Sequence, residues 1–158
     1  MSRHSGKCRR DSEIALASAC PGYRSGPAGS PTNRTALVTS SGDHQFVFLL
    51  AEQTLRTRIG TAEVMIEQLD RVLGVMALTN VSIGIIPASA GLGAHTQTAF
   101  WIFDNDLVKV ETLTAALDIT RPDEIEIYVT AFDQMQQAAR YGRSAKSLIL
   151  KARDELLQ

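Results

Sequence analysis

The sequence is poor in the residues that form most metal and redox sites. It has two cysteines and three histidines among 158 residues. Cys8 and Cys20 do not have the CxxC spacing of a metal or redox site, and His4, His44 and His95 share no motif. We therefore expect no disulfide framework, no metal and no cofactor.

Long apolar runs are also lacking. No run approaches the roughly 20 residues that a membrane-spanning helix needs. The residues before Cys20 have some features of a lipoprotein signal, but Asp11 and Glu13 interrupt an apolar region that is already too short. The sequence predicts a cytoplasmic protein with no membrane association.

Neither sign of charge dominates the chain, whose formal net charge is −1. The balance is nevertheless uneven. Residues 1–45 carry six Lys and Arg against three Asp and Glu, a balance of +3, whereas residues 46–158 carry ten against fourteen, a balance of −4. Binding to the DNA backbone depends mainly on Lys and Arg. We therefore expect this chain alone to bind DNA poorly.

The N-terminal segment differs in composition from the rest. Residues 1–45 contain eight Ser, five Gly and three Pro, with little apolar periodicity. Such a composition is typical of chain that cannot bury a core. We expect residues 1–45 to be a mostly disordered or aberrant segment and residues 46–158 to form one folded domain.

Within the domain, strand-like and helical patterns alternate. The run from Phe46 is strand-like, passes into a possible helical turn and stops at Gly60. Residues 80–87 alternate as a half-buried strand, and residues 99–113 form a hairpin around Asp104-Asn105-Asp106. Residues 114–120 are a candidate for one more strand.

Three helices are expected. Thr61 caps the first, Pro122 begins the second, and Ser144 caps the third, with apolar residues at helical spacing in each. The predicted fold is α/β, or α+β, with a partly antiparallel sheet that includes a hairpin and is packed by about three helices.

The glycine-bracketed loop before the hairpin does not match a phosphate cradle. Gly91 and Gly93 would need a third glycine where Thr96 stands, and a helix afterwards. We interpret the loop as a turn between strands. Ser89 also lacks the G-x-S-x-G context of a nucleophile elbow. The sequence therefore predicts no catalytic residues and no enzyme.

Four charged residues near strand ends form the candidate ligand or partner site. They are Glu52, Arg56, Arg58 and Glu111, and they line one pocket if the fold brings those ends together. His95 is a further candidate at the rim of that pocket. The alternative is that all five are solvated side chains or members of surface ion pairs.

A family resemblance covers about residues 46–157. It rests on the segments FLLAEQTLRTRIGTAEVMIEQLDRVL, NVSIGIIPASAG, AFWIFD, VKVETLTAALDITRPDEIEIYVTAFDQM and SAKSLILKA. They resemble the uncharacterised C-terminal domain that follows an Xre-type helix-turn-helix in many actinobacterial regulators, also described as antitoxin-like. The matching residues are Glu52, Leu55, Arg56, Arg58, Gly60, Met65, Gln68, Leu69, Asn80, Val81, Pro87, Ala90, Gly91, Phe100, Val110, Glu111, Thr112, Pro122, Tyr128, Phe132 and Ser147.

The resemblance implies a non-catalytic role in transcriptional control, through protein contacts or an effector. The implied partners are a second copy of the chain, as a homodimer, or a small partner protein. DNA would be reached only through a helix-turn-helix, which residues 1–45 do not supply. That segment keeps only Pro21-Gly22 and Arg34 of the family's opening elements, so we expect a truncated or wrongly started reading frame, or else a stand-alone domain.

Two other interpretations stay open. One is a small-ligand sensor or degenerate enzyme with a pocket around Glu52, Arg56, Arg58 and Glu111. The other is a truncated remnant without independent function, in which an uncovered sheet edge and apolar face would cause aggregation.

Overall fold

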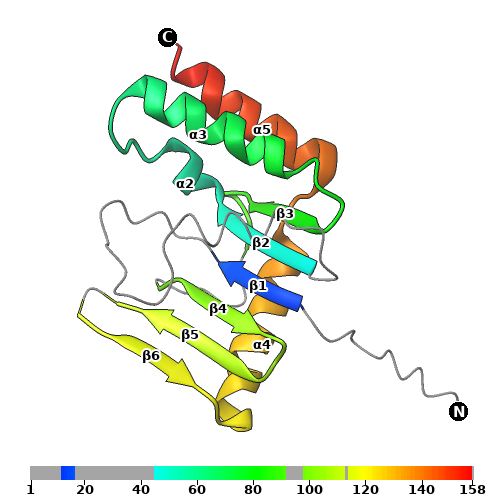
Figure 1. Ribbon diagram of the computed structural model, residues 1–158. Helices are drawn as coiled ribbons and strands as arrows, with labels where there is room; N and C mark the ends of the chain where they lie inside the picture. The colour runs from blue at the N-terminus through cyan, green and yellow to red at the C-terminus, as the bar shows by residue number, and fades with distance from the viewer. Residues whose placement is uncertain (1–11, 17–44, 92–97, 113, 158) are drawn as a thin grey trace, which may run out of the picture.

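The structure is a computed structural model that describes residues 12–16, 45–91, 98–112 and 114–157 (Figure 1). Two strands and two helices come first, four strands follow them, and two helices end the chain. The strands are Ser12–Leu16 (β1), Gln45–Ala51 (β2), Val81–Ile86 (β3), Phe100–Phe103 (β4), Leu107–Glu111 (β5) and Ala116–Ile119 (β6), and the helices are Glu52–Arg56 (α2), Ala62–Val75 (α3), Pro122–Ala138 (α4) and Gly142–Glu155 (α5).

All of these strands belong to one mixed sheet. Their order is β3-β2-β1-β4-β5-β6. β1, β2 and β3 are parallel to one another, whereas β4 pairs with β1 and β5 in the antiparallel sense, and β6 pairs with β5 in the same way. The predicted α/β class with a partly antiparallel sheet is confirmed.

The structure differs from the sequence expectation at β1. This strand lies inside the segment 1–45 that we expected to be mostly disordered, yet it pairs with β2 on one side and β4 on the other. Backbone hydrogen bonds to two neighbouring strands hold this short strand in place. The composition of the surrounding segment does not indicate such pairing. Residues 1–11 and 17–44 lie outside the described part of the chain.

The predicted hairpin and the candidate strand after it are confirmed. β4 and β5 are joined by a tight turn in which Asp104 and Asn105 have φ values of 50° and 62°. The Asp106 N–H donates to the Phe103 carbonyl oxygen at 2.9 Å. Asp and Asn tolerate this left-handed backbone better than most residues, which explains the turn. The candidate strand at residues 114–120 is β6.

The three expected helices are present. The Thr61 hydroxyl caps α3 by accepting the Val64 N–H at 3.4 Å, and Pro122 begins α4, as predicted. The predicted cap of the last helix is wrong by three residues: Tyr141, not Ser144, is the N-cap, and α5 begins at Gly142. Gly142 takes a positive φ of 54°, so it turns the chain before Ser144 is reached.

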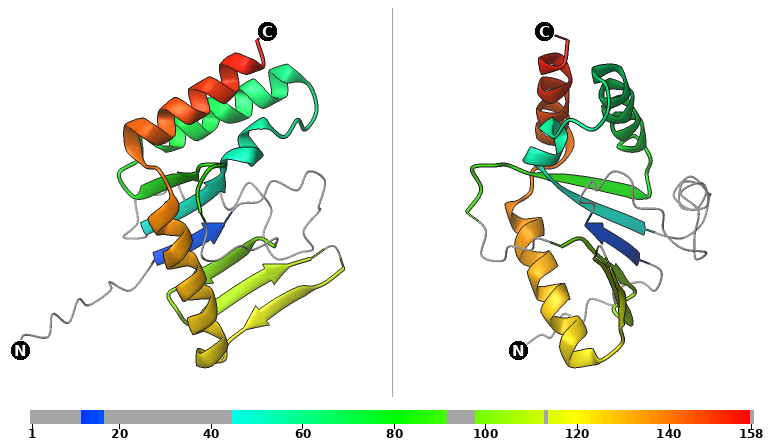
Figure 2. Two further views of the ribbon diagram at one scale, coloured as in Figure 1. Left: turned by 180° about the vertical axis from the view of Figure 1, so that it is seen from behind. Right: turned by 90° about the vertical axis from the view of Figure 1, so that its left-hand side faces the viewer.

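The helices cover the sheet unequally, because strand residues alternate between its faces. α4 runs along one face, packed on Leu49, Ile86, Phe100, Ile102, Val108 and Val110 (Figure 2). α3 and α5 lie side by side and cover the β2–β3 end, where Ile83 and Ile85 pack against Leu69 and Ile149. The two cores lie largely on opposite faces, so a side chain's position in the alternation decides which helix it contacts.

Gly84 in β3 is one place where the packing requires glycine. A Cβ there would lie 2.7 Å from Tyr141 Cζ and 2.9 Å from Leu49 Cδ2. Burial of this ring also raises the pKa of the Tyr141 hydroxyl. The close approach couples β3 to the connection between α4 and α5.

We expect Gly84→Ala to lower the free energy of unfolding by about 1–3 kcal/mol, because the Tyr141 ring must move to admit a methyl group. Gly74→Ala is the matched control. Its Cβ would meet no atom within 4 Å, and alanine in α3 should raise stability by about 0.5–1 kcal/mol. Urea unfolding of both variants checks this; equal effects at the two sites would contradict it.

Candidate functional site

Two of the predicted site residues, Glu52 and Arg56, meet where β2 passes directly into α2. They stand four residues apart, on one face of the short helix. Arg56 Nη1 lies 2.6 Å from Glu52 Oε1, and the two side chains are only 28% and 15% exposed, respectively. This pair is therefore better shielded from water than an ordinary surface ion pair.

The same two side chains hold other elements in place. Arg56 Nε donates to Glu155 Oε2 at 3.0 Å, at the end of α5. Glu52 Oε2 accepts the Ala88 N–H at 2.9 Å, just after β3. We call Glu52, Arg56, Glu155 and the Ala88 N–H the α2 clamp, since they join α2 to α5 and to the end of β3.

The electrostatics of the α2 clamp favour the charged forms of both residues. The Ala88 N–H, and then Arg56, hold the pKa of the Glu52 carboxyl below its ordinary value, and nearby Lys151 contributes weakly in the same direction. Hydrogen bonds to Glu155 and Glu52 raise the pKa of Arg56. Each charged group therefore already has hydrogen-bond partners within the clamp, as in a structural contact.

The other predicted site residues do not join the clamp. Arg58 is exposed after α2. Glu111 ends β5, which is three strands away from β2 in the sheet, or about 14 Å at ordinary strand spacing. His95 lies outside the described residues. The structure thus brings together Glu52 and Arg56, and adds Glu155, which the sequence did not single out.

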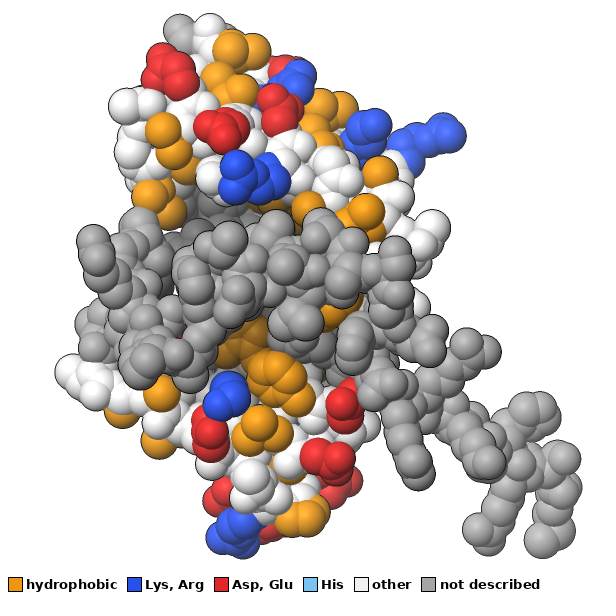
Figure 3. All heavy atoms as spheres, in the orientation of Figure 1, with side chains coloured by type: hydrophobic (Ala, Val, Ile, Leu, Met, Phe, Trp, Pro, Cys, Tyr) orange, Lys and Arg blue, Asp and Glu red, His pale blue; other side chains and the backbone are white. Residues whose placement is uncertain are grey.

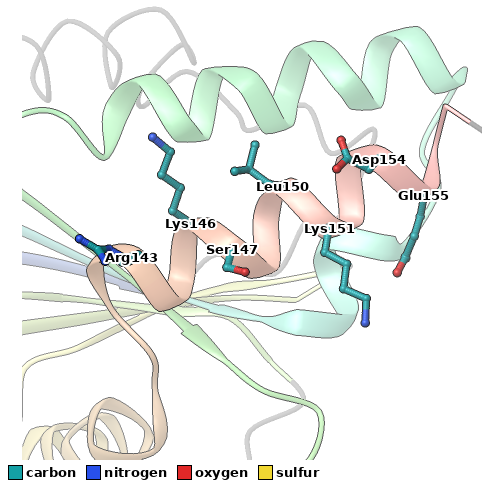
Figure 4. Close-up of a pocket in the computed structure, with 7 residues that line it drawn as sticks. All are labelled: Arg143, Lys146, Ser147, Leu150, Lys151, Asp154 and Glu155. Atoms are coloured by element: carbon teal, nitrogen blue, oxygen red, sulfur yellow. The ribbon is translucent and has the colours of Figure 1, made fainter.

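A second feature, which the sequence analysis missed, is an open groove along α5. Its cavity volume is about 610 Å³. The residues that line it all lie on the side of α5 that faces the viewer in Figure 4, where Lys146, Leu150 and Asp154 point upward and Ser147, Lys151 and Glu155 point downward. We call this the α5 groove; it is lined by Arg143, Lys146, Ser147, Leu150, Lys151, Asp154 and Glu155.

The cations and the carboxylates of the α5 groove differ in whether they form ion pairs. Among the described residues, Arg143, Lys146 and Lys151 form no ion pair. The two acidic side chains do: Asp154 lies 3.7 Å from Arg153, and Glu155 is held by Arg56. Arg56 also pairs with Glu52, and Arg153 also pairs with Asp70. The groove therefore presents two carboxylates that share their cation with another carboxylate, and three cations that form no ion pair within the described residues.

The sequence contains a helical spacing that indicates the α5 groove. Arg143, Lys146 and Leu150 recur at i, i+3 and i+7, and Ser147 and Lys151 are four residues apart, so all share one side of a helix. The helical pattern of the sequence singles out only the apolar positions of this helix. It could not have distinguished these cations from paired ones, because pairing depends on neighbouring elements.

The described ranges contain neither a cluster of metal ligands nor a membrane-spanning helix. No three His, Cys, Asp or Glu side chains gather there as metal ligands. None of the helices in those ranges is long and apolar enough to cross a membrane.

We expect Arg56→Met to lower the free energy of unfolding by about 1–2 kcal/mol, since it removes bonds to two carboxylates and leaves Glu52 partly buried. Arg71→Met is the control. Arg71 pairs with Glu67 on α3, with both side chains more than 60% exposed, and its loss should cost less than about 0.5 kcal/mol. Denaturant melts that rank the two variants the other way would contradict the clamp.

The α2 clamp should also make stability depend on pH. Because the folded pKa of Glu52 lies below 4.5, its contribution is present in full above that pH and is lost as pH falls through the folded pKa. The stability advantage of the wild type over Glu52→Gln should shrink between about pH 5 and pH 3. Thermal melts across this range measure it, and a constant advantage would show that Glu52 is not held as described.

One family comparison finds a match. The model of DUF5753, a domain of unknown function, matches residues 31–151. No curated protein matches the chain. The match covers most of the sheet, all of the α2 clamp except Glu155 and most of α5, and it begins earlier than the boundary at residue 46 that the sequence suggested. The chain belongs to the DUF5753 family.

Proposed function

We propose that this chain is a non-catalytic regulatory domain that acts through protein–protein contacts. The observation that carries the proposal is the α5 groove, where three cations that form no ion pair with any described residue line one open face of a helix. The resemblance to antitoxin-like Xre-type regulators of actinobacteria supports the regulatory part. In this proposal the domain is cytoplasmic and receives a partner, while a separate helix-turn-helix contacts DNA.

The shape of the groove suits a macromolecular segment better than a small substrate. It is an open hollow along a helix, and its lining combines cations with the apolar Leu150 and the hydroxyl of Ser147. A segment that docks there can place alternate side chains against several turns of α5. Small-molecule sites, in contrast, usually enclose most of the ligand's surface.

Charge identifies the kind of partner. Unpaired Lys and Arg side chains attract an acidic segment and steer its approach. Duplex DNA is the less favoured partner, because residues 46–158 carry a balance of −4 and phosphate binding needs an extended positive surface. We therefore assign the groove to an acidic segment of a partner protein.

The small-ligand sensor or degenerate enzyme is the second interpretation. Its support is limited to Glu52 and Arg56, which already bind each other, Glu155 and Ala88. A ligand would have to displace these bonds, and Glu111 is three strands away. The truncated-remnant interpretation predicts aggregation, and the denaturant melts described above test it through the cooperativity of unfolding.

The full chain should bind a short fluorescein-labelled, glutamate-rich peptide, and binding should weaken as salt rises. Lys146→Glu with Lys151→Glu should weaken it by about tenfold or more, because both changes place repulsion in the groove. Arg58→Glu with Arg121→Glu is the matched control, with the same change in net charge outside the groove. Fluorescence anisotropy measures both.

Two results would overturn the proposal. One is equal loss of binding in the groove variant and the control variant, which would mean that only net charge matters. The other is tighter binding of duplex DNA than of the acidic peptide at the same salt concentration, which would make the chain a nucleic-acid binder.

A further inference from the structure

The sheet has an open edge at β6. This strand ends the order of the sheet, and no other strand of the described residues lies beyond it (Figure 1). The space-filling view shows charged and apolar side chains mixed at this lower end of the molecule (Figure 3). Leu117, in the middle of β6, is 50% exposed. An open edge carries backbone groups that can pair with a further strand.

The pairing with β5 determines which backbone groups of β6 point outward. The Thr112 N–H donates to the Ala115 carbonyl oxygen at 2.8 Å, so these two residues form a hydrogen-bonded pair. Such pairs alternate along an antiparallel ladder. Leu117, opposite Val110, is therefore bonded to β5, whereas the N–H and C=O of Ala116 and Asp118 point to the open edge.

We propose that β6 pairs with β6 of a second copy of this chain, antiparallel about a two-fold axis at Leu117. In this register Ala116 of one copy exchanges both backbone hydrogen bonds with Asp118 of the other, and the reverse pair forms by symmetry. All outward backbone groups of Ala116 and Asp118 are then used. The two sheets become one continuous sheet of two copies, which is a closed, isologous dimer.

The neighbouring registers are less favourable. Shifting the axis to Asp118 places two carboxylates directly opposite each other, which is destabilising. Shifting it to Ala116 leaves Asp118 opposite residue 114, outside the strand. Only the axis at Leu117 makes two backbone-bonded pairs within β6 and keeps the acidic residues apart.

Side chains support the same register. Leu117 stands opposite its own copy as a non-bonded pair, where side chains approach closely. The two half-exposed leucines therefore shield each other from water. Asp118 does not oppose the contact, because Lys109 Nζ lies 2.9 Å from both of its carboxylate oxygens. At the start of α4, Arg121 likewise pairs with Asp123 at 2.6 Å.

The length of β6 limits the strength of this dimer. A strand of four residues buries much less surface than a standard stable interface. The dimer should accordingly form in the upper micromolar range and dissociate on dilution. This inference does not depend on the α5 groove or on the proposed function.

The test uses the full chain in sedimentation equilibrium at rising concentration. The wild type should pass from monomer to dimer and no further. Leu117→Lys and Leu117→Glu should each remain monomeric, because like charges meet at the two-fold axis. An equimolar mixture of the two variants should recover the dimer, since opposite charges then face each other. Ile127→Lys, at a 68% exposed position on α4, is the control and should dimerise as the wild type does.

Circular dichroism melts establish that each variant is folded. Several results would overturn the proposal: a wild type that stays monomeric at every concentration, species larger than the dimer, or Leu117→Lys dimerising as well as the wild type. Failure of the mixed variants to pair would exclude the register at Leu117. Loss of dimer in Ile127→Lys alone would place the interface on α4.

Discussion

The backbone ladder of β1 is the contact on which the arrangement of the sheet depends. β1 lies between β2 and β4, and it is the strand at which the parallel half of the sheet meets the antiparallel half. Backbone hydrogen bonds to the strands on both sides hold it in place. α4 reinforces the join, because it follows β6 and leads to Arg140, whose backbone exchanges hydrogen bonds with Ile85 at the opposite edge (Figure 2).

Because β1 and β4 lie between β2 and β5, charged residues that follow different strand ends in the sequence lie far apart in the sheet. Glu52 follows β2 and accepts hydrogen bonds from Arg56 and the Ala88 N–H, whereas Glu111 lies on the far side of β1 and β4. Of the charged residues that the sequence singled out, Glu52 and Arg56 belong to the α2 clamp. Arg143, Lys146 and Lys151 of α5, which the sequence did not single out, form no ion pair among the described residues and line the open α5 groove. Pairing, more than residue type, distinguishes the charges of the clamp from the charges that we assign to a partner.

The two surfaces that we assign to partners are independent of each other. The α5 groove depends on side-chain charge at the β3 end of the molecule, and the β6 edge depends on backbone groups at the opposite end of the sheet (Figure 1). A domain with one surface for an acidic partner and another for its own copy can combine recognition with self-association. This combination agrees with the regulatory role that we propose for the chain.

The sequence by itself determined the local elements. Apolar spacing defined α3, α4 and the strand β3, and Asp104-Asn105 defined the hairpin turn, because helix period, strand alternation and turn chemistry are properties of neighbouring residues. Only the tertiary structure decided the place of β1, the separation of Glu111 from Glu52, and the pairing of Glu155 with Arg56 across 99 residues. Strand order and long-range ion pairs depend on which surfaces meet after folding, and a local sequence pattern does not determine those surfaces.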